Sequence, residues 1–182
     1  MKAWRIPLTN AALLFSEDTM KFTKSIIAAG VFLIFGANAW ADSGSFEAVT
    51  SLTSNWTTME HLDGTVTIGS QSGTSTDFNV SGGPFVEGGS NIFDCLAYIR
   101  KTPAGSDMES SCTTTHASGD KLFVRASRKA GDIAEGGGGE GVSRFVGGTG
   151  RFEGMTGRCT YTADYLAGQK SVTKSKCSWQ RP

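Results

Sequence analysis

The sequence lacks an excess of charge of either sign, because 17 lysines and arginines balance 17 aspartates and glutamates. Proteins that bind the phosphates of nucleic acid carry a basic surface, so no nucleic-acid partner is expected. Long apolar runs are equally scarce. Residues 25–36 are mostly apolar but fall short of the roughly 20 residues that a membrane-spanning helix needs, and no later segment is apolar enough. We therefore expect no stable membrane span.

Known metal-binding and catalytic patterns are missing as well. Zinc sites usually place cysteines about two to four residues apart, and no two cysteines here have that spacing. Glycines 136, 138 and 141 match G-x-G-x-x-G in form, but no βαβ unit surrounds them. No nucleophile elbow and no Ser/His/Asp order is present. We expect no metal and no cofactor, and no catalytic residue can be assigned.

The N-terminal region has the three parts of a secretory signal. Residues 20–24 carry two lysines, the apolar run 25–36 follows, and Ala39 and Ala41 form an A-x-A cleavage site. Cleavage is expected after Ala41, so residues 20–41 are predicted to be a signal peptide and residues 42–182 a single domain. Residues 1–19 look unlike a signal and are interpreted as lying before the true start, or as a long n-region. The protein is predicted to be exported, to the periplasm or the exterior of a Gram-negative-type bacterium.

The predicted domain is rich in glycine, serine and threonine and shows no helical periodicity. Short runs with two-residue alternation are separated by glycine-rich turns, which is typical of an antiparallel sandwich or barrel. Residues 70–76 and 133–141 are interpreted as loops. Strands are expected at residues 45–52, 64–68, 77–80, 91–101, 108–117, 121–128, 142–146, 159–165 and 171–179.

Four cysteines follow the signal, and an even number in an exported chain predicts disulfide bonds. Three pairings are possible. Cys95–Cys112 and Cys159–Cys177 are preferred, because each pair lies in strand-like sequence interrupted by one turn and would join adjacent antiparallel strands. The alternative use of these residues is a metal site in which Cys112 and His116 are ligands.

The most distinctive motif is GGTGRFEGMTG, at residues 147–157. Its glycine content favours a tight turn, a short bend and re-entry into a strand, since glycine allows positive φ and close backbone approach. Phe152 and Met155 are expected to point inward and plug one end of a core. The motif lacks the G-K-[ST] ending of a phosphate-binding loop. The residues given this structural role are Gly147, Gly148, Gly150, Phe152, Gly154 and Gly157.

This motif and the RCTYT that follows it resemble the signature of allene oxide cyclase/dirigent-like (calycin-type) barrels. The resemblance is closest to small exported bacterial proteins, mostly of unknown activity, in which two cysteine strands and a G-D-x-x-F strand precede the motif. Here Cys95, Cys112 and residues 119–123 occur in that order. The resemblance covers residues 91–165 and implies an all-β, disulfide-stapled antiparallel barrel. It implies no activity, because fold does not carry function, and the glutamate of the plant cyclases has no assigned counterpart here.

Three functions are compatible with these features. A barrel that holds one small apolar ligand is favoured. The first alternative is a structural or interaction protein with a filled barrel, which pairs with further copies through its outer sheet. The second is a cyclase- or isomerase-type enzyme, whose polar groups would be Glu60, His61, His116, Arg125 and Glu153. The candidate ligand-binding residues are Trp56, Phe93, Tyr98, Phe123, Phe145, Tyr161 and Tyr165.

Overall fold

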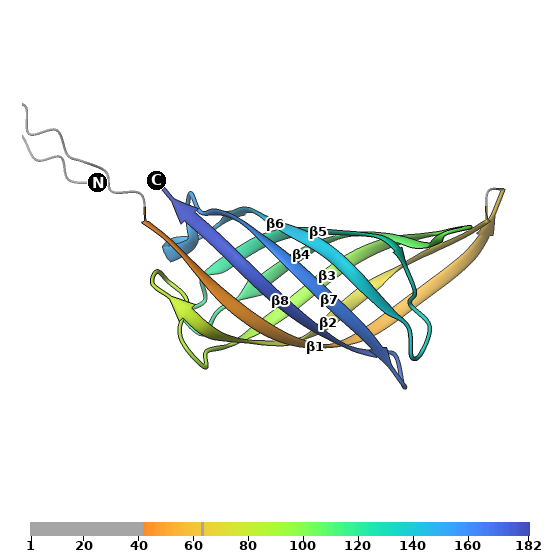
Figure 1. Cartoon of the computed structure of the whole chain (residues 1–182), viewed down its shortest axis with the longest axis horizontal. Coiled ribbons are helices and arrows are strands. Elements are labelled where there is room, and N and C mark those ends of the chain that lie inside the picture. The colour runs from red at the N-terminus through yellow and green to blue at the C-terminus, as the bar shows by residue number, and fades with distance from the viewer. Residues whose placement is uncertain (1–41, 63) are drawn as a thin grey trace, which may run out of the picture. The chain divides into compact units, whose positions relative to one another are not determined.

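The computed structural model describes residues 42–62 and 64–182, which form one closed antiparallel β-barrel (Figure 1). Each strand pairs with its neighbours in sequence, and the last pairs with the first to close the barrel. The predicted all-β barrel is therefore confirmed. The predicted signal peptide and residues 1–19 lie outside the described residues. The strands are β1 (Asp42–His61), β2 (Gly64–Ser81), β3 (Ser90–Thr102), β4 (Gly105–Thr115), β5 (Lys121–Gly131), β6 (Gly138–Gly148), β7 (Thr156–Leu166) and β8 (Lys170–Arg181).

Two-residue alternation decides which side chains enter the barrel. Along β3 and β7 every second residue is buried, as expected for a strand with one face toward a core. The segment 70–76 is the main departure from the sequence prediction, because it belongs to β2 and pairs with β1 and β3. Its inward residues are polar, and Gln71 and Ser75 hydrogen-bond to Ser54 and Thr50 of β1. The predicted loop 133–141 is likewise shorter, since β6 begins at Gly138.

The two ends of the barrel are built differently. The terminal end holds Asp42 and Arg181, whose side chains form an ion pair at 2.9 Å. A 3₁₀ turn, η1 (Gly150–Phe152), lies at this end and buries Phe152 completely. Phe152 contacts Phe85 with ring centroids 5.5 Å apart, so aromatic side chains plug the terminal end.

The glycine motif produces this plug. Gly150 has φ of 55°, and a Cβ there would overlap the Asp120 carboxylate. Only glycine fits such a position without strain. Met155 is 1 % exposed and lies inside the barrel with Phe152, as the motif predicts.

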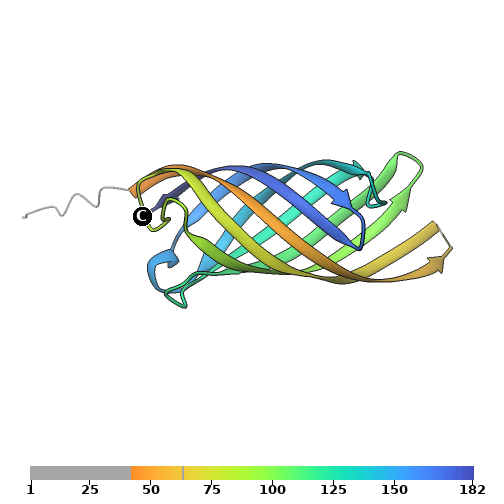
Figure 2. The same cartoon turned by 90° about the horizontal axis from the view of Figure 1, so that it is seen from below.

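The opposite end, here called the hairpin end, carries the long β1–β2 hairpin. β1 pairs with β8 only as far as Thr53, and β2 pairs with β3 only from Val66 onward. Beyond Thr53, β1 continues with β2 as its single partner among the described strands, and the hairpin tip, residues 60–61 and 64–65, is a two-stranded ribbon that extends past the other strands (Figure 2). On the same end, Ile133 in the β5–β6 loop packs against the inward residues of β3, β4 and β7.

Two disulfides cross-link neighbouring strands. Cys95 of β3 is bonded to Cys112 of β4, and Cys159 of β7 is bonded to Cys177 of β8. All four cysteines are buried on the inner face. Disulfides persist in oxidising compartments, so these bonds indicate an oxidising environment for the folded protein.

Candidate site in the barrel interior

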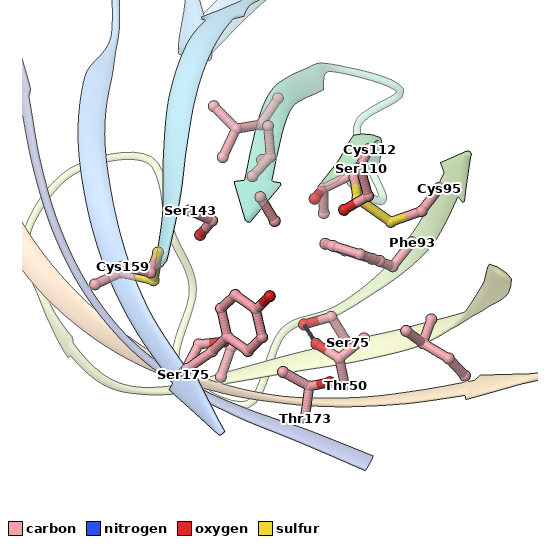
Figure 3. Close-up of a pocket in the computed structure, with 18 of the residues that line it drawn as sticks. Thr50, Ser75, Phe93, Cys95, Ser110, Cys112, Ser143, Cys159, Thr173 and Ser175 are labelled. Carbon is pink, nitrogen blue, oxygen red and sulfur yellow. Dashed lines mark hydrogen bonds between the residues drawn. A yellow bond between two sulfur atoms is a disulfide. The ribbon is translucent and has the colours of Figure 1, made fainter. Parts of the chain in front are cut away.

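The barrel interior contains a cavity of about 100 Å³. Its wall combines apolar side chains with a series of hydroxyl groups. Figure 3 shows the Phe93 ring and the Cys95–Cys112 disulfide on one side of the space. The small hydroxyl residues labelled around it are Thr50, Ser75, Ser110, Ser143, Thr173 and Ser175.

This cavity is smaller than most ligand sites but can hold a small molecule. Typical sites for drug-sized ligands measure roughly 300–1,000 Å³. An apolar cavity of about 150 Å³ in another protein binds benzene. Because the cavity here is smaller than that one, a body of about six carbon atoms is the upper limit of what this barrel accommodates.

At the terminal end, the cavity wall carries a buried carboxyl group. Asp77 is 4 % exposed and accepts a 2.9 Å hydrogen bond from Asn91 Nδ2. Burial raises the pKa of Asp77 to about 6, although the Asn91 hydrogen bond and the positive charge of Arg151 act in the opposite direction.

His116 lies at the same end and also lines the cavity. Its ring packs against Phe152, with centroids 4.3 Å apart. Nε2 is buried and has no hydrogen-bond partner among residues 42–62 and 64–182. Burial lowers the pKa of His116 to about 4; Arg151 adds to this shift and Asp120 opposes it.

At the hairpin end, the cavity wall includes Tyr165 and Ser171, which face each other across β7 and β8. Arg128 lies beside Tyr165, outside the cavity lining. Its guanidinium carbon is 5.2 Å from the centroid of the Tyr165 ring, and the residue is 1 % exposed. Ser171 Oγ and all three side-chain nitrogens of Arg128 are buried without a hydrogen-bond partner in the described part of the chain.

Tyr161 also lines the cavity and lies on β7 between Cys159 and Tyr165. Burial raises its pKa to about 12, with Tyr165 adding to the shift and Arg128 opposing it. The hydroxyl therefore stays protonated and donates a 3.4 Å hydrogen bond to the carbonyl of Ser127. The Tyr165 hydroxyl points to Met108 Sδ at 3.9 Å.

The structure divides the seven aromatic residues that the sequence suggested as ligand-binding. Phe93, Phe145, Tyr161 and Tyr165 line the cavity. Tyr98 and Phe123 do not, because each occupies the outward phase of its strand and is 48 % and 36 % exposed, respectively. Trp56 is also outside the lining and packs against the inward residues of β3 and β4 near the base of the hairpin.

The candidate enzyme residues do not form a catalytic group. Glu60 and His61 are exposed at the tip of the hairpin, and Arg125 and Glu153 are exposed elsewhere. His116, the residue after β4, is buried, and its ring packs against Phe152. Ser118 and Arg151 are the side-chain neighbours of the Asp120 carboxylate, at 2.9 and 3.7 Å.

Arg128 is a candidate functional residue that the sequence-based prediction missed, because that prediction relied on aromatic residues. The signal was present, since Leu122, Val124 and Ala126 alternate inward along β5 and Arg128 is the next residue in that phase. An arginine in an inward phase breaks the rule that charged side chains stay outside. Asp77 on β2 was missed because its surrounding sequence is polar and predicted only a short strand at residues 77–80.

Comparison with known proteins does not assign a family to this chain. No family model matches it, and searches of curated proteins and solved structures found no match. The eight-stranded antiparallel barrel is established by its strand pairing. Among the described residues no helix is long and apolar enough to cross a membrane.

Proposed function

We propose that this protein binds one small, largely apolar ligand inside its barrel. The observation that carries the proposal is the cavity of about 100 Å³ between two plugged or covered ends. A filled barrel, the alternative for a purely structural protein, would leave no such space, because protein interiors normally pack without voids of this size. The resemblance of residues 147–157 to allene oxide cyclase/dirigent-like barrels supports the same reading, as these barrels enclose their sites.

The proposed ligand binding is tested by titrating the purified protein with hexan-1-ol and measuring binding by calorimetry. β4 supplies a matched pair of variants, because Ser110 lines the cavity and its neighbour Ser111 is exposed. Ser110→Leu places a bulky apolar side chain in the space and is expected to weaken binding about tenfold or more. Ser111→Leu adds the same group outside and should leave affinity unchanged. Absence of binding in the unmodified protein, or equal effects of the two variants, would contradict the proposal.

We also propose that the protein is exported before it functions. Two features support this: the disulfides, which need an oxidising compartment, and the signal-like sequence that ends at Ala41. Asp42, the first residue after the expected cleavage point, pairs with Arg181 of β8. N-terminal sequencing of protein recovered from the periplasm or medium of expressing cells should start at Asp42. Recovery of the protein only in the cytoplasm, with its thiols reduced, would refute export.

A further inference from the structure

Arg128 carries an inference about the chemical class of the ligand. We infer that the barrel takes a small monocarboxylic acid, with its apolar body in the cavity and its carboxylate against the Arg128 guanidinium. This inference rests on the proposed function, because it concerns the same cavity. It adds the requirement that the ligand carry a negative charge at its hairpin end.

Burial of Arg128 is the first observation behind this inference. The side chain is 1 % exposed, and Nε, Nη1 and Nη2 have no hydrogen-bond partner in residues 42–62 and 64–182. None of the ion pairs found among those residues includes Arg128. A guanidinium keeps its charge in proteins, so it cannot reduce the cost of burial by losing a proton. A buried charge without a counter-charge is strongly unfavourable, and an anionic ligand would supply that counter-charge.

The position of Arg128 links it to the cavity. Ala126, two residues earlier on the inward face of β5, lines the cavity, as does Tyr165, over whose ring the guanidinium lies. The Ser171 hydroxyl, also without a partner in the described chain, projects from the strand beside Tyr165. The lining at this end of the cavity thus includes a hydroxyl group, and the cation lies just outside the lining, against the Tyr165 ring; both groups can donate hydrogen bonds to a carboxylate.

The backbone around Arg128 is shaped to hold this side chain. A Cβ at Gly131 would overlap the guanidinium, and a Cβ at Gly139 would lie 2.9 Å from Arg128 Cδ. Gly141 is the cross-strand partner of Arg128, and a Cβ there would overlap the Tyr161 ring. The glycine-rich start of β6 therefore provides the space for Arg128 and Tyr161 inside the barrel.

Charge and size select a monocarboxylate among anions. A planar guanidinium matches the two oxygens of a carboxylate. Arg128 is the buried cation among residues 42–62 and 64–182, so a doubly charged phosphate would retain an uncompensated negative charge inside the barrel. The cavity of about 100 Å³ limits the apolar body to about six carbon atoms.

The test compares hexanoate with hexan-1-ol, which share an apolar chain and differ in charge. Calorimetric titration at neutral pH should show hexanoate binding about ten- to a hundredfold more tightly, as expected for hydrogen bonds to a charged group. Arg128→Met keeps a long side chain but removes the charge, and should abolish this preference while hexan-1-ol still binds. Arg125→Met, on the exposed face of the same strand, is the matched control and should retain the preference.

The outcomes separate this inference from the proposed function. If neither compound binds, the proposed ligand-binding function fails. If hexan-1-ol binds and hexanoate binds no better, the cavity is real and the carboxylate inference alone is wrong. The comparison of the two compounds on the unmodified protein decides this even if Arg128→Met does not fold. A preference for hexanoate that persists in a folded Arg128→Met would assign the recognition to another group and also overturn the inference.

Discussion

Two residues at the terminal end have pKa values displaced in opposite directions by the same cause. Burial disfavours charge on both side chains, which raises the pKa of Asp77 to about 6 and lowers that of His116 to about 4. The folded protein therefore holds a proton on Asp77 more tightly than the unfolded chain does, and holds one on His116 less tightly. Linkage converts these differences into a dependence of folding stability on pH.

The signs of the two contributions oppose each other. Stabilisation from Asp77 is complete below its ordinary pKa of 3.8 and is lost as the pH rises through about 6. Stabilisation from His116 is complete above its ordinary pKa of 6.5 and is lost as the pH falls toward 4. Each amounts to roughly 3 kcal/mol over this window, so their sum in the unmodified protein should be nearly flat.

Single substitutions should separate these contributions. In Asp77→Asn, the free energy of unfolding should rise from pH 4 to pH 6.5, because the His116 contribution remains. In His116→Phe, it should fall from pH 4 to pH 6, because the Asp77 contribution remains. Urea unfolding at a series of pH values measures both slopes. Parallel profiles for the two variants would show that these groups do not carry the pH dependence.

For single residues, the sequence predicts which face of a strand a side chain occupies better than it predicts the chemical role of that side chain. The alternation of Leu122, Val124 and Ala126 correctly marks the inward face of β5. The same alternation places Phe123 on the outer face of β5, and its aromatic character alone does not predict a position in the cavity. Whether a buried polar side chain finds a partner depends on residues far away in sequence. The unpartnered state of Arg128 could therefore not be predicted without the barrel.

Among the elements, η1 and its flanking glycines form the plug of the terminal end. Phe152→Ala should lower the free energy of unfolding by about 3–5 kcal/mol, because Phe152 is completely buried and contacts Phe85. Phe123→Ala removes the same group from the outer face of β5, where the ring is 36 % exposed, and should cost about 1 kcal/mol at most. Urea unfolding compares the two variants; equal losses would mean that η1 does not seal a packed core.

The two disulfides act on pairs of adjacent strands. Each closes a short loop, since the paired cysteines have sequence separations of 17 and 18. Replacing Cys95 and Cys112 together by alanine should lower the free energy of unfolding by about 3 kcal/mol, chiefly because the unfolded chain gains freedom. Reductant should then lower the stability of this variant further by a similar amount, through Cys159–Cys177. An unchanged unfolding midpoint in the double variant would contradict this account.

Element boundaries were harder to predict than element type. Residues 70–76 look like a loop because both faces of this part of β2 are polar, and glycine and serine are poor strand formers. The segment is a strand because it pairs with a strand on each side. Its inward side chains also hydrogen-bond to the neighbouring strand, as Gln71 does with Ser54 of β1. Such tertiary pairing overrides local preference and leaves no periodic apolar signal in the sequence.

For the whole molecule, closure of the sheet divides the chain into regions of different expected stability. In the barrel each strand has two neighbours, so opening one strand breaks two ladders of hydrogen bonds. The two-stranded tip of the hairpin, at residues 60–61 and 64–65, has one ladder, between β1 and β2, and Met59 of β1 likewise pairs on one side. A two-stranded hairpin is marginally stable in water, so this ribbon should open independently of the barrel.

Hydrogen exchange measures this difference directly. Amides near the hairpin tip, such as those of Met59 and Glu60, should exchange through local opening, far faster than those of Cys95 and Val124 in the barrel wall. A shortened chain in which Asn-Gly replaces residues 58–67 joins Thr57 to its cross-strand partner Ile68 through a two-residue turn. Because the cavity lining includes no residue from 58–67, this chain should unfold cooperatively and retain hexan-1-ol binding. Loss of binding in a folded shortened chain would instead make the hairpin a working part of the site.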